Sequence, residues 1–327
     1  MAQERLRFGA RMMLWALGVI FALSWGQAQA QTWPQRPVKI IVPLGPGAGV
    51  DITARLLGDR LGARWGQSVV IDNRPGGDGA VAMTAFTAAQ DDHTLLMSPT
   101  SSFTHHPWLY DKLPYDPLDL VPIARVSNTI VAIVVPSSSP IHSLADLVTM
   151  ARAEPGKLNW ATITGFFDFM FEAFLKKANL QMARVPYRNT VQAANDLAEG
   201  RIHVMMAAYA IIRPLVDSGK LRIVAFTARE RAAAAPDVPT AAEAGEPDLS
   251  IDGLVGLFGP RNLPGGTADR IATDVRDLLT DSTIVSRLTA TGQVVNFGTA
   301  AEFSAAIDLQ RSQAAEAGKL LGKNPAQ

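Results

Sequence analysis

The apolar positions of the chain alternate between short runs that predict buried strands and spaced patterns that predict amphipathic helices. Residues 38–43 form an apolar run of strand length, and residues 51–61 carry apolar side chains at helical spacing. A strand at residues 68–71, a helix at residues 80–89 and a strand at residues 94–97 are predicted next. This alternation of strands and helices predicts a βαβαβ unit with a parallel sheet.

A second block of the same kind occupies the rest of the chain. The apolar run at residues 130–135 precedes a helix at residues 145–153, for which Ser143 is the predicted N-cap. Further strands are predicted at residues 158–161, 183–186, 203–207, 221–227 and 254–259, and helices at residues 191–199, 268–280 and 300–314. Two α/β blocks without a flexible linker predict two α/β domains joined by crossing strands, with mainly parallel central sheets around a ligand cleft. We place domain 1 at residues 31–133 together with residues 256–327, and domain 2 at residues 134–255.

The first thirty residues have the pattern of an export signal. Three arginines, Arg5, Arg7 and Arg11, precede an uncharged apolar stretch at residues 12–25, and residues 28–30 read Ala-Gln-Ala. These features predict a cleaved signal peptide at residues 1–30 and a periplasmic mature protein. An uncleaved membrane anchor is the alternative, but about 14 apolar residues are short of the roughly 20 that a span needs. No later stretch comes close to that length, so we expect the mature protein to be soluble.

Composition and charge exclude several classes of partner and site. Loss of the signal peptide removes three arginines and one glutamate from thirty basic and thirty acidic residues, which leaves 27 and 29 and a net charge of −2. There is no basic surplus to attract nucleic acid or anionic lipid. The chain has no cysteine, which excludes disulfides, thiolate metal sites and cysteine nucleophiles.

Motifs for catalysis or cofactor binding do not stand out. None of the five histidines lies in a G-x-S-x-G or H-E-x-x-H context. The adjacent pair His105 and His106 has no acidic or third histidine partner at metal-ligand spacing, so we expect it in a surface turn. We therefore expect no catalytic residues, no metal and no cofactor.

The turn at residues 45–51, with the sequence GPGAGVD, carries three glycines at alternate positions before a predicted helix. It fits the dinucleotide fingerprint G-x-G-x-x-G poorly because Val50 stands at the third glycine, and the Gly-Lys-Ser/Thr of a phosphate-binding loop is missing. An anion cradle fits better, since glycines let the backbone approach a ligand and helix N-termini favour negative charge. Asp51 could serve as the helix N-cap or contact the ligand, and both roles stay open.

Several long segments resemble the solute-binding proteins of tripartite tricarboxylate transporters, the Bug family. The segments that carry the resemblance follow one another from about Trp33 to the last helix, and include WPQRPVKIIVPLGPGAGVDITARLL, VVIDNRPGGDGAVA, PWLYDKLPYDP, VPYRNT, SGKLRIVAFT and PDVPTAAEAG. The resemblance implies a type II periplasmic binding protein fold that closes on a small carboxylate. It also implies a monomer that delivers its ligand to membrane permease subunits. A sensor for a signalling kinase and, less favoured, an exported enzyme are the alternatives.

The resemblance also implies where the ligand binds. In the family, the ligand carboxylate is held by the loop after the first strand and by a Ser/Gly-rich loop of the second domain, with a hydroxyl-rich loop after the third strand nearby. The matching positions are Gly47, Ala48, Gly49, Asp51, Thr100, Ser101, Thr162, Ile163, Thr164, Gly165, Phe166 and Tyr209.

The sequence departs from the family in the second domain. Phe166 and Phe167 replace small polar residues, and Ala207 and Ala208 stand where an Asp-Asn pair is common. Each unpaired polar group of a polycarboxylate would cost roughly 1–3 kcal/mol. We therefore expect an aromatic or aliphatic monocarboxylate ligand, with Phe166, Phe167 and Tyr209 as an apolar wall. The alternative is that these rings belong to the core.

Overall fold

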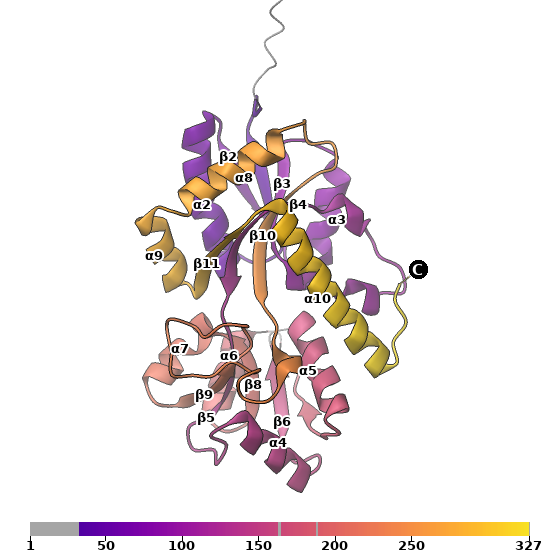
Figure 1. Cartoon of the computed structure of the whole chain (residues 1–327), viewed down its shortest axis with the longest axis vertical. Coiled ribbons are helices and arrows are strands. Elements are labelled where there is room, and N and C mark those ends of the chain that lie inside the picture. The colour runs from indigo at the N-terminus through magenta and orange to yellow at the C-terminus, as the bar shows by residue number, and fades with distance from the viewer. Residues whose placement is uncertain (1–32, 163–164, 188, 327) are drawn as a thin grey trace, which may run out of the picture. The chain divides into compact units, whose positions relative to one another are not determined.

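Two β-sheets organise the chain between residues 37 and 327 (Figure 1). The computed structural model describes residues 33–162, 165–187 and 189–326, so the predicted signal peptide at residues 1–30 lies outside the described residues. Within the described ranges, no helix combines the length and the apolar character that a membrane crossing requires.

The first lobe is built on a six-stranded sheet with the strand order β11-β4-β10-β3-β1-β2. Its strands are β1 (Val38–Val42), β2 (Val69–Asn73), β3 (Thr94–Pro99), β4 (Val121–Thr129), β10 (Gly253–Gly259) and β11 (Gln293–Gly298). Its helices are α2 (Gly49–Trp65), α3 (Ala80–Ala89), α8 (Thr267–Leu278), α9 (Ser282–Ala290) and α10 (Ala300–Leu321).

The second lobe is built on a five-stranded sheet with the order β7-β6-β8-β5-β9. Its strands are β5 (Val131–Pro136), β6 (Asn159–Thr162), β7 (Ala183–Arg184), β8 (Val204–Ala208) and β9 (Leu221–Phe226). Its helices are α4 (Leu144–Ala153), α5 (Phe166–Lys177), α6 (Thr190–Ala198) and α7 (Tyr209–Asp217).

The α/β architecture with two sheets is confirmed, but the prediction of mainly parallel sheets is wrong. Among the described strands, four pairings are parallel and five are antiparallel. The chain passes from β4 to β5 through Ile130 alone and returns from the second lobe along β10. A strand that arrives from the other lobe needs no crossover helix to join the sheet, so it can pair antiparallel. Both β5 and β10 run antiparallel to both of their neighbours. The domain boundaries that we placed stay a prediction.

Most elements lie where the apolar pattern predicts them. Helix α3 has the predicted bounds, and the Ser143 hydroxyl accepts the Asp146 N–H at 3.1 Å, which confirms the predicted N-cap of α4. The prediction missed five elements: β4, α5, α7, α9 and β11. Helix α7 was missed because Pro214 lies inside it, a residue that normally interrupts a helix.

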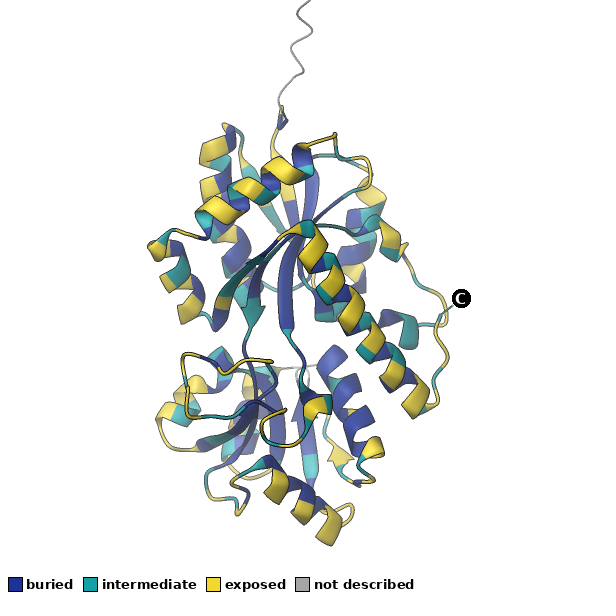
Figure 2. Cartoon of the chain, viewed as in Figure 1, coloured by how far each residue is buried: buried dark blue, intermediate teal, exposed yellow. Residues whose placement is uncertain are grey.

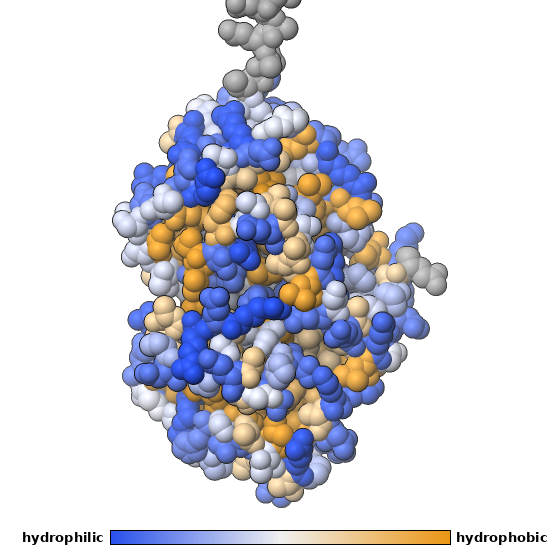
Figure 3. Space-filling view, viewed as in Figure 1, coloured by the Kyte–Doolittle hydropathy of each residue, from blue (hydrophilic) through white to orange (hydrophobic). Residues whose placement is uncertain are grey.

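Helix α10 links the two lobes (Figure 1). Its residues Ala314 and Ala317 are buried in the same apolar cluster as α5 of the second lobe. Nearer its start, buried Gln310 accepts the Thr100 hydroxyl at 2.5 Å and donates to the Asp252 carbonyl at 3.1 Å. Figure 2 shows that the sheets are buried while the outer faces of the helices are exposed. On the face shown in Figure 3, hydrophilic and apolar residues are interspersed.

Candidate functional site

The glycine loop between β1 and α2 presents its backbone to open space. Gly47 has φ +86°, a conformation that favours glycine, and a Cβ built on Gly45 or Gly47 meets no described atom within 4 Å. The N-cap of α2 is Ala48, which makes no side-chain cap bond within the described chain. This rules out the N-cap role considered for Asp51. The first N–H groups of a helix have no partner inside the helix, so this end of α2 offers donors to an anion.

The buried side chain of Asp51 fixes this loop by hydrogen bonding. Its side chain is only 1% exposed, and its carboxylate accepts the Gly47 N–H at 2.8 Å, Arg55 Nε at 3.0 Å and Asn73 Nδ2 at 2.8 Å. Asn73 Nδ2 also donates to the Leu44 carbonyl at 2.8 Å. Burial alone would raise the pKa of Asp51, but the hydrogen bonds from Arg55, Gly47 and Asn73 together lower it. The ionised carboxylate therefore fixes the loop, and a direct ligand contact of Asp51 stays a prediction.

The start of α5 lies in the second lobe and is more crowded with charge. Gly165 is its N-cap, with φ 86° and ψ −131°. Asp168 in the first turn accepts the Thr162 hydroxyl at 3.1 Å and Arg184 Nε at 2.9 Å, and a second nitrogen of Arg184 also pairs with it. The Thr162 hydroxyl is therefore already engaged. The two predicted site residues Ile163 and Thr164 lie outside the described residues.

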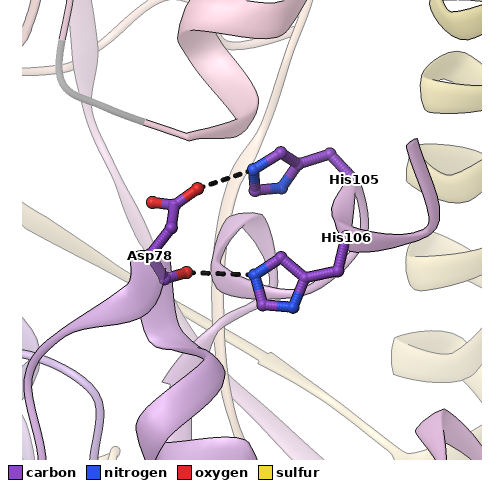
Figure 4. A group of neighbouring side chains, drawn as sticks. All are labelled: Asp78, His105 and His106. Carbon is purple, nitrogen blue, oxygen red and sulfur yellow. Dashed lines mark hydrogen bonds and ion pairs between the residues drawn. The ribbon is translucent and has the colours of Figure 1, made fainter. Parts of the chain in front are cut away.

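Asp78 of the first lobe reaches the start of α5. It lies in the short helix η1 (Gly77–Gly79), and a Cβ built on Gly165 would come within 2.7 and 2.8 Å of its two carboxylate oxygens. Its Oδ2 lies 2.7 Å from His105 Nε2 (Figure 4). A pocket of about 450 Å³ opens beside this contact, lined by Asp78, Leu109, Gly165, Asp168, Phe169, Glu172, Arg184 and Lys323.

The expectation that His105 and His106 lie in a surface turn is wrong. Both side chains are fully buried, and Asp78 supplies the acidic partner that their sequence neighbours lack. His106 Nε2 lies 3.1 Å from the Asp78 carbonyl (Figure 4). Its Nδ1 lies 2.7 Å from the Tyr115 hydroxyl. A carbonyl only accepts, so His106 donates through Nε2.

Burial and the neighbouring His105 lower the pKa of His106 to about 4. The side chains of Asp78, His105 and His106 are close enough together to hold a metal ion. However, both ring nitrogens of His106 already have hydrogen-bond partners, the Tyr115 hydroxyl and the Asp78 carbonyl.

The remaining predicted residues are buried or half-buried. Thr100 is fully buried with its hydroxyl on Gln310, and Ser101 is half-buried in η2 (Thr100–Ser102). Phe166 and Phe167 are buried in the apolar core of the second lobe. Tyr209 is 8% exposed and packs edge-on against Phe226, with 5.8 Å between ring centroids. The apolar wall stays a prediction, and the structure gives these rings partners in the core.

Sequence reasoning missed four side chains of these contacts: Arg55, Asn73, Asp78 and Arg184. Two of them, Asn73 and Asp78, lie in the segment NRPGGDG that begins at the end of β2. Their position was a usable signal, because loops at the carboxyl ends of parallel strands meet at one edge of the sheet, where ligands bind.

The chain is similar to several known proteins in sequence and in fold. A family model described as tripartite tricarboxylate transporter family receptor matches residues 53–319. Over 291 residues the chain is 33% identical to a UPF0065 protein of Bordetella bronchiseptica, covering 86% of this chain and 84% of that protein. R. palustris Rpa4515, solved with adipate, is similar with a TM-score of 0.77 and 27% identity, covering 90% of this chain and 100% of that one. The periplasmic binding protein BugD has the same fold, with a TM-score of 0.73, 24% identity and the same coverage.

Proposed function

The chain belongs to the tripartite tricarboxylate transporter receptor family, and on that premise we propose that it is a periplasmic solute-binding protein. It captures a small carboxylate by closure of its lobes and delivers it to the permease of a tripartite tricarboxylate-type transporter. The start of α2 carries this proposal, because its first N–H groups have no partner inside the helix and Asp51 fixes the glycine loop before it. The adipate bound to the related Rpa4515 supports a small carboxylate as the ligand.

In this proposal the ligand carboxylate accepts hydrogen bonds from backbone N–H groups at the start of α2. Asp51, Asn73 and Arg55 hold the loop before the ligand arrives, so little of the binding free energy is lost in ordering it. Closure then brings the start of α5 against the first lobe, where Gly165 meets Asp78. The ligand is released unchanged, and no catalytic step is involved.

The ligand class that we favour is an aromatic or aliphatic monocarboxylate. The start of α5 already carries the carboxylate of Asp168 and lies against that of Asp78. Ala207 and Ala208, at the end of β8, offer no side-chain polar partner. One anion cradle with few further polar partners suits a single carboxylate.

Isothermal titration with hexanoate, benzoate, adipate and citrate tests the proposal. We expect one-site binding of a monocarboxylate, with closure visible as a smaller radius of gyration in X-ray scattering. Tight citrate binding without a response to the monocarboxylates would overturn the ligand class, and binding of no carboxylate would overturn the function. Mass spectrometry of the recovered ligand tests turnover. Capture of permease subunits or of a sensor kinase from membranes separates transport from signalling.

A further inference from the structure

The carboxylate of Asp78 lies between His105 of its own lobe and Gly165 of the second lobe. Asp78 has φ +53° and lies between Gly77 and Gly79, whose φ angles are +55° and +100°. A left-handed conformation is uncommon for a residue other than glycine and costs free energy, so surrounding contacts must maintain it. Those contacts are with Gly165 in the second lobe and with His105.

The contact with Gly165 is close enough to exclude any side chain there. The Asp78 carboxylate occupies the space that a Cβ on Gly165 would take, and this residue is the N-cap of the twelve-residue helix α5. Gly165 has no side chain to cap its own helix. A negative group near a helix N-terminus is stabilising, and here Asp78 of the opposite lobe adds to Asp168 of the helix itself.

His105 positions the carboxylate. It is fully buried, its Nε2 lies 2.7 Å from Asp78 Oδ2, and its ring packs against Phe166 and Phe169 of α5 at centroid distances of 6.1 and 6.3 Å. Its Nδ1 is buried and has no hydrogen-bond partner among the described residues. The imidazole of His105 therefore contacts both the Asp78 carboxylate and the aromatic rings at the start of α5.

We propose that Asp78 is a specificity-determining residue: by placing a carboxylate of the protein at the start of α5, it disfavours ligands that carry a second carboxylate there. This inference rests on the proposed function. Like charges brought together at a binding surface reduce affinity for the wrong partner.

The neighbouring charges strengthen this effect. Asp168 and Glu172 line the same pocket as Asp78, and since Asp168 is paired with Arg184, a second ligand carboxylate would face the acidic side chains of Asp78 and Glu172. Two basic residues also line it. Arg184 is already paired with Asp168, and Lys323 lies over the ring of Phe169 at 5.2 Å.

Hexanoate and adipate form a matched pair of probes, because both have six carbons and differ by one carboxylate. The affinities of both acids are measured by isothermal titration for the full mature chain and for Asp78→Asn and Asp78→Gly. Asparagine keeps the shape and an acceptor for His105, and glycine suits the left-handed backbone. The control is Asp92→Asn, which removes the same charge from another Asp–His pair, where Asp92 lies 2.7 Å from His93 Nδ1 before β3.

We expect the wild-type chain to prefer hexanoate, and both Asp78 variants to shift the affinity ratio toward adipate by about tenfold or more. The Asp92 variant should keep the wild-type ratio. Three results would overturn the inference while the proposed function stands. The wild-type chain could prefer adipate, the affinity ratio could stay unchanged in Asp78→Asn, or Asp92→Asn could shift the ratio equally. Failure of the wild-type chain to bind hexanoate or adipate overturns this inference, and failure to bind benzoate and citrate as well overturns the proposed function.

Discussion

The starts of α2 and α5 both border the proposed site, but they are held in different ways. At α2, the buried Asp51 is bound by Gly47, Arg55 and Asn73, all from the first lobe. At α5, Gly165 meets Asp78 of the opposite lobe. The α2 half is therefore complete within one lobe, whereas the α5 half is complete only when the lobes meet. We therefore propose that the first half receives a ligand before closure and that the second half selects among ligands during closure.

The largest effect is expected from Gly165→Ala. The added methyl would overlap the Asp78 carboxylate, and overpacking of this kind costs about 1–3 kcal/mol, so hexanoate affinity should fall about 5- to 150-fold. The positive φ of Gly165 should also lower the free energy of unfolding.

Adding Asp78→Gly to this variant separates the two effects. It removes the overlap and should restore affinity, but stability should stay low because the strained backbone remains. Calorimetry and urea unfolding of the single and double variants measure both. No recovery of affinity in the double variant would contradict contact between the two halves.

As the pH falls, the contacts around Asp78 should be lost before those around Asp51. The reason is His106, whose Nε2 donates to the Asp78 carbonyl. The pKa of His106 is about 4 in the folded chain against an ordinary 6.5, so the unfolded chain binds this proton more readily. The free energy of unfolding should be steady above pH 6.5 and fall by up to about 3 kcal/mol as the pH drops to 4. His106→Asn should lose this dependence, whereas His142→Asn, at an exposed histidine, should keep it. Equal acid sensitivity of all three chains in urea unfolding would refute this role.

The α2 half should respond to Asp51→Asn. Loss of the ionised acceptor of Gly47 and Arg55 should lower the free energy of unfolding at pH 7 by about 1–3 kcal/mol. Since the pKa of Asp51 lies below its ordinary value of 3.8, its contribution is present above that pH and is lost as the pH falls through the lower folded value. Asp59→Asn, at an exposed position of α2, is the control and should change little. Urea titrations across this pH range measure the difference, and equal losses in both variants would exclude a special role of Asp51.

The smallest effect is expected from the glycines of the loop itself. Gly47→Ala should cost about 1–2 kcal/mol because its φ is +86°, and should reduce hexanoate affinity several-fold. Gly45→Ala is the matched control, because no described atom lies within 4 Å of the added methyl and its φ is not positive. Equal affinities of the two variants would mean that the shape of the loop at Gly47 does not matter for binding.

Local patterns were enough to predict the elements whose stability depends on their own residues. Helix α3 and strand β1 follow from apolar spacing alone. Strand β4 was missed because Arg125 and Ser127 interrupt its apolar pattern. Their partners, Asn296 and Gln293, come from β11, far along the chain, at distances of 2.9 Å. A strand that pairs its polar side chains with a distant strand has no local apolar signature.

The sequence by itself determined the α/β class, the family, the absence of cysteine chemistry and the glycine turn that suits an anion. The tertiary structure decided which carboxylate meets which helix start. Asp51 was visible beside its helix, because its partner Gly47 is four residues away. Asp78 could not be linked to Gly165 or His105, because neither contact lies within one element and no short-range spacing encodes them. Electrostatic contacts between lobes depend on where the fold brings distant backbones together. The contact of Asp78 with the start of α5, which we propose selects the ligand, is of this kind.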